Sequence, residues 1–235
     1  MLGYLVIRRR WQAVYWAAVG LTIGGVVTLA FVGIASSFSF LGAIGTRADV
    51  FGPPGLVYNP QNPSINGFFS RILFLGAGSN RGIAAIRLTL TALTDLLVAG
   101  FAIRATILTR GEDDEDWRVL SIWIVAMILL SPVAWYHYVV LLFVPFAGLV
   151  AAAANGRVSD RALLLGFASY ILLEVLGLTE IVMTAMMRVH WLSLPLLIVL
   201  SSGLFAGLVC AYISSYWFAT DPAGTWQPSR LPASL

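Results

Sequence analysis

The sequence predicts an all-α fold, a polytopic transmembrane bundle of about six helices. Of its 235 residues 59% are hydrophobic and 11% are charged, whereas about a quarter of the residues of a soluble domain are charged. The mean hydropathy is +0.88. Several apolar runs approach the ~20 residues that a helix needs to cross a bilayer. These runs are continuous rather than alternating, which favours spanning helices over the strands of a membrane barrel.

Arginine supplies all fourteen basic side chains of the chain. The pI of about 9.3 reflects few acidic residues rather than a basic surface, so no nucleic-acid partner is expected. The arginines instead predict the orientation in the membrane, because basic residues concentrate in cytoplasmic loops. One cysteine, Cys210, lies inside an apolar run, and an intrachain disulfide is therefore excluded.

The chain begins with a short apolar run, residues 1–7, followed by Arg8–Arg10. This run is typical of the end of an earlier span, as if the chain started partway through a larger protein. The arginines place the start of the next apolar run, the first predicted span, in the cytoplasm. Residues 36–82 then lie outside, and a second span leads back to Arg104 and Arg110 at the inner face.

The outer interval contains the polar segment around which the rest of the chain is organised, Asn59 to Gly67 (NPQNPSING). Its two Asn-Pro steps block a regular helix, because proline lacks a backbone N–H and restricts the residue before it. The amide and hydroxyl groups of the segment suit a polyhydroxylated ligand at the membrane surface. A connecting loop with ordinary turn chemistry is the alternative interpretation.

A short amphipathic helix is predicted at 64–75, with Ser64 as its N-cap. Its large apolar side chains fall on one face, while Gly67 and Arg71 fall on the other. We expect this helix to lie in the membrane interface with Arg71 facing the water. It would then hold the Asn-Pro segment against the bilayer.

The stretch 118–154 is apolar apart from a Ser-Pro turn. As one helix it would measure roughly 54 Å, far more than the ~30 Å of the hydrocarbon core. Two spans with a tight turn near Pro132 are therefore predicted, and the turn lies on the outer side with the Asn-Pro segment. The predicted spans are 13–35, 83–108, 118–131, 137–154, 161–178 and 191–212, within a transmembrane domain of residues 1–220 that is followed by a cytoplasmic tail, 221–235.

Few side chains of the apolar runs can carry chemistry. His137 follows Trp135 in the predicted outer turn, where it is either part of an interfacial aromatic belt or a functional group. Asp95 and Glu174 lie within spans, where a carboxyl group needs a hydrogen-bond partner on another helix or a polar cavity. The chain has no metal-ligand spacing, no Ser/His/Asp order and no Gly-rich phosphate loop. Sugar transfer from a lipid phosphate needs none of these, but it needs a base, cations near the leaving phosphate and polar groups around the ring.

Two motifs together resemble a known family. Residues 62–71 (NPSINGFFSR) resemble the "N-x-S-x-x-G-x-x-x-R" segment of glycosyltransferase family 87, whose members are polytopic enzymes related to mannosyltransferases that use polyprenyl-phosphate mannose. Residues 130–138 (LSPVAWYHY) resemble the family's "SPxSWxHH" turn. Ala134 stands in place of the family's serine there, and Tyr138 stands in place of its second histidine.

The resemblance covers most of the chain and corresponds to the C-terminal half of the family. It implies a GT-C fold with the active site at the outer face, and two groups that stabilise charge at the leaving phosphate, His137 and Arg71. The substrate-binding residues that it implies are Asn62, Ser64, Asn66 and Trp135. The family's presumed base, an aspartate in an outer loop of the N-terminal half, has no counterpart here.

The expected activity is the transfer of a mannosyl or other hexosyl group from a polyprenyl-phosphate sugar to a cell-envelope lipid or glycan. No cofactor or metal is expected, since the lipid-linked sugar is a substrate, and a separate N-terminal half is a further expected partner. We expect a multi-pass protein of the bacterial plasma membrane with both termini in the cytoplasm. Two alternatives stay open: a truncated, non-catalytic relative or subunit that binds lipid-linked sugar, and half of a transporter, motivated by Asp95 and Glu174.

Overall fold

The structure, a computed structural model, describes residues 2–39, 62–73, 81–109, 116–131, 134, 136–187 and 194–220. Every regular element in these parts of the chain is a helix, which confirms the prediction of an all-α membrane protein. The elements are α1 (Leu2–Ile7), α2 (Trp11–Val32), α4 (Ile65–Leu73), α5 (Arg81–Leu108), α6 (Asp116–Leu129), the 3-10 helix η3 (Tyr136–Leu142), α7 (Phe143–Ala154), α8 (Asp160–Met187) and α9 (Leu194–Thr220).

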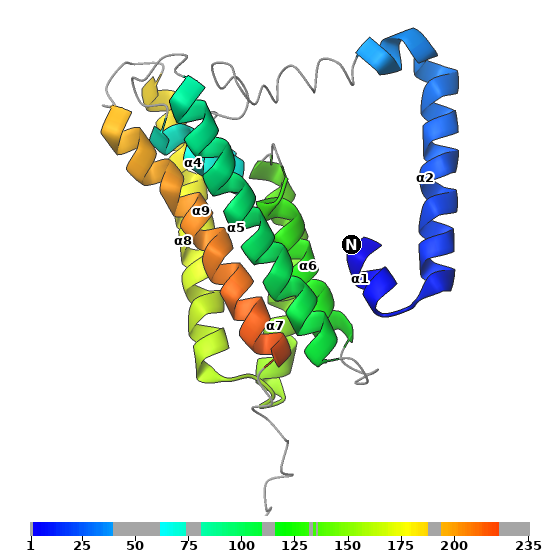
Figure 1. The fold of residues 1–235 in the computed structure, drawn as a ribbon. Helices are drawn as coiled ribbons and strands as arrows, with labels where there is room; N and C mark the ends of the chain where they lie inside the picture. Colours follow the sequence, from blue (N-terminus) through cyan, green and yellow to red (C-terminus); the bar gives the residue numbers. More distant parts are fainter. Residues whose placement is uncertain are drawn as a thin grey trace, which may run out of the picture.

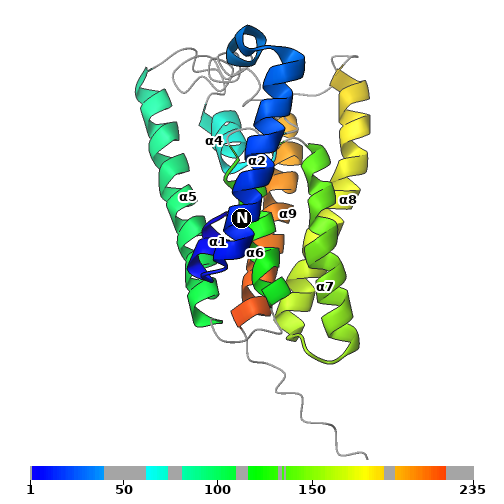
Figure 2. The ribbon, with the colours of Figure 1, turned by 90° about the vertical axis from the view of Figure 1, so that its right-hand side faces the viewer.

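Helices α5 to α9 lie side by side as a bundle (Figures 1 and 2). α6 is the central helix, in contact with α5, α7 and α9. Its side chains Ile122, Val125 and Leu129 are at most 1% exposed, and they share one core with Leu204 and Leu208 of α9. A helix that is apolar on all sides is expected in such a position.

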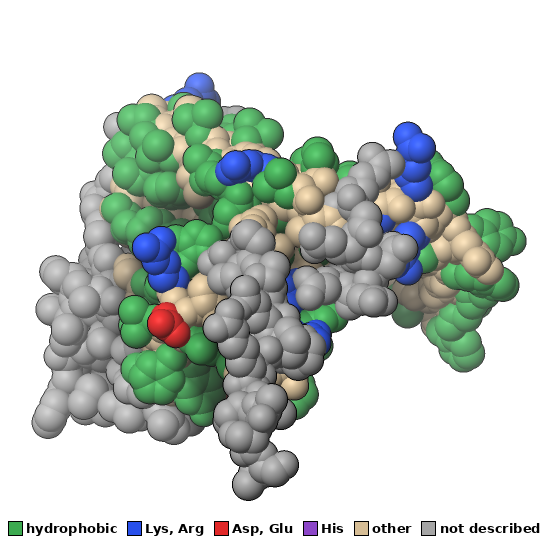
Figure 3. All heavy atoms as spheres, turned by 90° about the horizontal axis from the view of Figure 1, so that it is seen from below, with side chains coloured by type: hydrophobic (Ala, Val, Ile, Leu, Met, Phe, Trp, Pro, Cys, Tyr) green, Lys and Arg blue, Asp and Glu red, His purple; other side chains and the backbone are tan. Residues whose placement is uncertain are grey.

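The bundle has two distinct ends. Arg8, in the turn after α1, donates a 3.0 Å hydrogen bond from Nη2 to Thr109 Oγ1, so that turn lies at the end of α5. Arginine side chains lie on this face of the molecule (Figure 3), which we name the arginine end. α4 lies at the opposite end, beside the start of α5 (Figure 2), and we name this the motif end.

Three helical segments among the described residues are long and apolar enough to cross a membrane: Trp11–Val32, Arg81–Leu108 and Ser202–Thr220. α6 and the η3–α7 pair are apolar but shorter. The chain reverses between Leu129, where α6 ends, and Tyr136, where η3 begins. The stretch is therefore not one continuous helix, and two membrane spans here stay a prediction.

α8 is longer than its predicted counterpart. The span expected at 161–178 extends to Met187, so most of the predicted outer segment 179–190 is helical. Residues 179–187 contain neither glycine nor proline, and nothing in their sequence stops a helix.

α9 also continues past its predicted end at residue 212, because its last turns pack inside the bundle. Ser214 Oγ donates a 2.7 Å hydrogen bond to the Ala162 carbonyl of α8. The ring of Phe218 lies 4.9 Å from that of Trp117 in α6. Such contacts depend on neighbouring helices, which hydropathy along the chain does not register.

α2 stands apart from the bundle (Figure 1). None of its residues is buried. It ends at Gly33, whose φ of +82° lies in the region that favours glycine. The apolar surface of α2 therefore suits direct contact with the hydrocarbon of a bilayer.

Gly148 of α7 provides a test of the bundle packing. A Cβ at this position would overlap the ring of Trp117, lying 2.7 Å from its Cε3, and that ring also packs against Phe218. We expect Gly148→Ala to lower the midpoint of thermal unfolding in lipid nanodiscs by several degrees, because overpacking costs about 1–3 kcal/mol. Gly100→Ala in α5 is the matched control, since no atom lies within 4 Å of a Cβ there and alanine favours a helix. Equal midpoints for the two variants would contradict the contact between α6 and α7.

Candidate active site

Ser64 is the N-cap of α4, as predicted. Its Oγ accepts a 3.0 Å hydrogen bond from the Gly67 N–H, which has no carbonyl partner in the first turn of a helix. Asn62 shapes the chain just before the cap, because its Oδ1 accepts a 3.2 Å hydrogen bond from the Ser64 N–H. The Asn-Pro-Ser sequence therefore forms a defined turn that directs α4 (Ile65–Leu73).

The Asn62 side chain also joins the two sequence motifs. Its Oδ1 accepts a second hydrogen bond, 2.9 Å long, from the backbone N–H of Ala134, a residue 72 positions away. Ala134 is fully buried and takes part through its backbone alone. The two motifs thus meet at the motif end, and a small residue at 134 is required by space rather than by its side-chain chemistry.

Gly67 allows the turn to close on itself. A Cβ on this residue would overlap the Asn62 carbonyl oxygen and lie 2.7 Å from the Asn62 Cγ. The carbonyl cannot move away without loss of its hydrogen bond from Arg71, and the side chain cannot move without loss of those from Ser64 and Ala134. A glycine three residues after the N-cap is therefore a condition of the Asn62 position.

Arg71 is buried, and the prediction that it faces the water is wrong. It is 1% exposed, and its Nη1 donates a 2.6 Å hydrogen bond to the Asn62 carbonyl. α4 buries the face that carries Gly67, Ser70 and Arg71, whereas Ile72 is 40% exposed. The polar face points inward because its hydrogen-bond partners lie there, and an apolar side chain outside costs little in a membrane.

Arg87 of α5 is a second buried arginine at the motif end, and sequence analysis did not identify it as a site residue. It is 1% exposed, and its Nη1 donates a 3.1 Å hydrogen bond to Ser70 Oγ. Ser70 in turn donates a 2.7 Å hydrogen bond to the carbonyl of the half-buried Asn66. An arginine in the first turns of an apolar helix was the signal that could have found it. The guanidinium of Arg71 bonds to Asn62 and that of Arg87 to Ser70, and two buried positive groups at the motif end favour an anion there.

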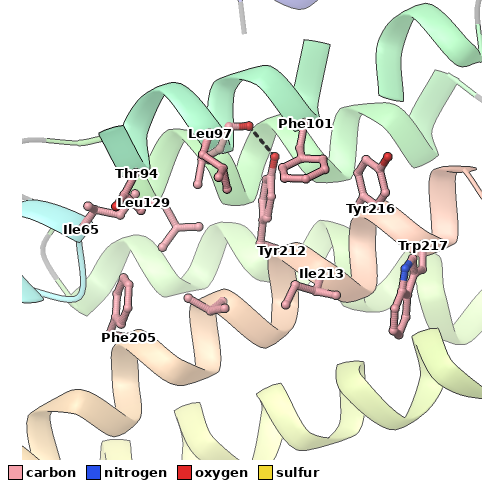
Figure 4. A pocket seen from close by; sticks show the side chains of 12 residues that line it. Ile65, Thr94, Leu97, Phe101, Leu129, Phe205, Tyr212, Ile213, Tyr216 and Trp217 are labelled. Atoms are coloured by element: carbon pink, nitrogen blue, oxygen red, sulfur yellow. Dashed lines mark hydrogen bonds between the residues drawn. The ribbon is translucent and has the colours of Figure 1, made fainter. Parts of the chain in front are cut away.

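An apolar groove reaches α4 at the first residue of that helix (Figure 4). It is a cavity of about 390 Å³ between α5 and α9, with Leu129 of α6 on its floor. Ile65, the first residue of α4, lines the end of the groove near the motif, and Tyr216 lines its other end. The Tyr212 hydroxyl, which reaches across the groove, donates a 2.6 Å hydrogen bond to the Val98 carbonyl. The groove therefore offers a hydrocarbon surface that ends at α4, the helix that carries Arg71.

Two predicted site residues lie wholly or partly outside what the structure describes. Trp135 is one of them, and for His137 the structure describes the backbone within η3 but not the side chain. The Asn-Pro step at residues 59–60 also lies outside the described residues. Within the described residues no group of three His, Cys, Asp or Glu side chains is placed to hold a metal ion. The structural hydrogen bond expected for Asp95 is not found there either, since its Oδ1 is buried and accepts no hydrogen bond from any described residue.

Substitution of Asn62 tests the connection between the motifs. Asn62→Ala leaves the buried N–H groups of Ser64 and Ala134 without their acceptor, and we expect it to lower the unfolding free energy by about 1–3 kcal/mol. Asn62→Asp keeps an acceptor oxygen and should lower the unfolding free energy by less. Asn155→Ala is the control, because Asn155 is exposed and its amide bonds only to the nearby Ala151 carbonyl. Thermal unfolding in nanodiscs measures all three, and an Asn62→Ala midpoint no lower than that of the control would refute the connection.

Comparison with known proteins supports one family. The model of glycosyltransferase family 87 matches residues 1–132, which include the whole first motif and end within the second. No curated protein and no solved structure matches the chain. Because the family match covers more than half of the 235 residues, and because the helices are apolar and long, the chain is a membrane protein that belongs to glycosyltransferase family 87.

Proposed function

We propose that the chain takes part in transfer of a mannosyl or other hexosyl group from a polyprenyl-phosphate sugar to a hydroxyl of a cell-envelope lipid or glycan. One observation carries the proposal: the apolar groove between α5 and α9 ends at Ile65, the first residue of the short helix that carries the buried Arg71 and bonds to the buried Arg87 through Ser70. A polyprenyl phosphate has the same two parts in the same order, a long hydrocarbon chain that ends in an anion. Membership of a glycosyltransferase family supports the sugar part.

We propose the following reaction at this site. The bond between the sugar anomeric carbon and the phosphate oxygen breaks, and a bond forms between that carbon and the acceptor oxygen. The acceptor proton passes to a base, and the polyprenyl phosphate leaves with a further negative charge. Arg71 and Arg87 act on that charge, since guanidinium groups in a water-poor site stabilise a developing phosphate anion. We assign the base to none of the described residues.

The other predicted residues fall into two groups: those that position Arg71 and those that we propose to contact the ligand. Asn62 and Ser64 are buried and hold the turn before α4, so we propose that they position Arg71 rather than contact the sugar. Asn66 is less buried than either, and we propose that its side-chain amide contacts the ligand. His137 and Trp135 remain proposed contacts to phosphate or acceptor from the second motif.

The proposed orientation places the motif end outside a bacterial plasma membrane and the arginine end in the cytoplasm. Its basis is the concentration of basic residues on one side, since Arg8–Arg10 and Arg157 flank helices at the arginine end. The site then faces the compartment in which envelope lipids and glycans are assembled.

Transfer activity tests the proposal. We expect Arg71→Lys, Arg87→Lys and His137→Ala each to lower transfer by about 10²-fold, because each removes a group that acts on the leaving phosphate. Membranes that contain the protein are supplied with polyprenyl-phosphate [³H]mannose and a host lipid extract, and label in sugar-bearing lipid product is counted. Arg157→Lys, exposed at the arginine end, is the matched control and should keep full activity.

Two results would count against the proposal. If the wild-type protein binds the donor but labels no product, the chain is a binding subunit or an inactive relative. If all three site variants transfer at the rate of the control, the site lies elsewhere. Quantitative immunoblotting of the membranes distinguishes loss of activity from loss of protein.

A further inference from the structure

A second apolar groove lies between the η3–α7 pair and α8. Its volume is about 1300 Å³, and its walls include Phe143, Ala147 and Phe167. α7 and α8 are antiparallel neighbours joined by a short turn at the arginine end, so residues at equal distances from that turn lie level with each other. The groove, which we name the α7–α8 groove, therefore runs from near this turn to η3.

Glu174 is the one charged side chain among the described residues that line the α7–α8 groove. It lies level with Val140 of η3, since the two residues are equally far from the ends of α7 and α8 that meet at the turn. Glu174 is exposed, so in a bilayer its carboxylate would meet hydrocarbon, which is costly unless a hydrogen-bond donor binds it. The groove therefore fits an occupant that is hydrocarbon along most of its length and carries donors at its η3 end.

The η3 end of this groove lies beside the candidate active site. η3 contains His137 and follows Ala134, through which the second motif bonds to the first. Leu173, the residue before Glu174, belongs to the same buried core as Ala134 and Ile65. A headgroup held at Glu174 is therefore next to the segment that joins the two motifs.

The two grooves also end at a similar depth. Thr94, at the α4 end of the groove between α5 and α9, lies as far after Arg81, the first residue of α5, as Glu174 lies before Met187, the last residue of α8. At 1.5 Å per residue, each is roughly 20 Å from the tip of its helix. Both tips are at the motif end of the bundle (Figure 1). Two lipids, one in each groove, would therefore place their polar ends at the level of the first turn of α4.

The charges at these two ends are opposite. The groove between α5 and α9 ends at the helix that carries the buried Arg71, which favours an anionic headgroup. The carboxylate of Glu174 repels an anion and accepts hydrogen bonds from hydroxyl groups. The two grooves therefore select lipids with different headgroups, because each end disfavours the headgroup that suits the other.

We propose that the α7–α8 groove binds the acceptor of the transfer reaction, and that this acceptor is a lipid whose uncharged headgroup carries several hydroxyl groups. The assignment rests on the proposed function. The hydrocarbon of the acceptor lies along α7 and α8, and Glu174 accepts hydrogen bonds from its headgroup. Glu174 thereby holds the headgroup next to η3 and the motif end, as a binding residue.

Photo-cross-linking to the full chain in nanodiscs tests the groove by a readout that does not need activity. The probe is a glucosyl diacylglycerol with a diazirine in one acyl chain, and the reference is the same lipid with all sugar hydroxyls acetylated, which removes the donors. Mass spectrometry identifies the labelled peptides. We expect the glucosyl lipid to label α7 and α8 about tenfold more than the acetylated lipid, because hydrogen bonds to a charged group are among the stronger ones.

Three substitutions locate the effect. Glu174→Leu should lower labelling by the glucosyl lipid to the level of the acetylated one, and Glu174→Gln, which keeps an acceptor oxygen, should lower it less. Ala147→Trp fills the groove and should reduce labelling of α8 by both lipids. Ala18→Trp is the matched control, since Ala18 is an exposed alanine of α2, away from both grooves, and this variant should label as wild type does.

Two outcomes would overturn the proposal. If the acetylated lipid labels α7 and α8 as strongly as the glucosyl lipid, or if Glu174→Leu changes nothing, the groove holds bulk lipid only. If neither lipid labels these helices, a protein segment covers the groove.

A third probe, a photoreactive polyprenyl phosphate, separates this proposal from the proposed function. We expect it to label α5 and α9 and to be unaffected by Glu174→Leu. If it does so while the glucosyl lipid fails to label α7 and α8, the proposed function stands and the acceptor groove is refuted. If it labels neither α5 nor α9, the proposed donor site fails, and the assignment of the α7–α8 groove to an acceptor fails with it.

Discussion

The motif end depends on one amide oxygen. Asn62 Oδ1 accepts from the backbone of Ser64 and from that of Ala134, so it defines the turn before α4 and attaches that turn to the segment after α6. The carbonyl of the same residue accepts from Arg71. Because these groups are buried, water does not compete for them, and each bond is worth more than it would be at a surface. Two segments that are distant in sequence thereby form one site wall.

Hydropathy predicted the helices well and the orientation of α4 poorly, and the reason is the same in both cases. Long apolar runs identify helices that lie in hydrocarbon whatever their neighbours are, as α2 and α5 illustrate. α4 is short, and which of its faces is buried depends on what lies beside it. Asn62 and Arg87 draw its polar face inward, and lipid accepts the apolar side chain of Ile72 on the other side. An amphipathic helix exposes its polar face only where the protein is surrounded by water, and α4 has lipid on its outer side.

The site itself could be predicted in part. Asn62, Ser64, Gly67 and Arg71 were recognisable from their spacing, but the sequence could not say that they bind one another, because hydrogen bonds between side chain and backbone leave no periodic signal. Arg87 is visible in the sequence as a polar residue in an apolar run, yet it becomes informative only when α4 is known to lie beside it. The end of α9 shows the same limit, since its helix continues where Ser214 finds a carbonyl of α8.

The isolation of α2 makes lipid a component of the architecture. No described side chain of that helix is buried, and its contacts are chiefly with α1, so little protein packing sets its tilt or its distance from the bundle. In a bilayer these are set by acyl-chain length and lateral pressure, which act on a helix as packing does elsewhere. A detergent micelle has neither property, and its own curvature acts on the space between α2 and the bundle. Preparations of this chain in different amphiphiles are therefore different conformational ensembles, and rates or affinities are comparable only within one lipid composition.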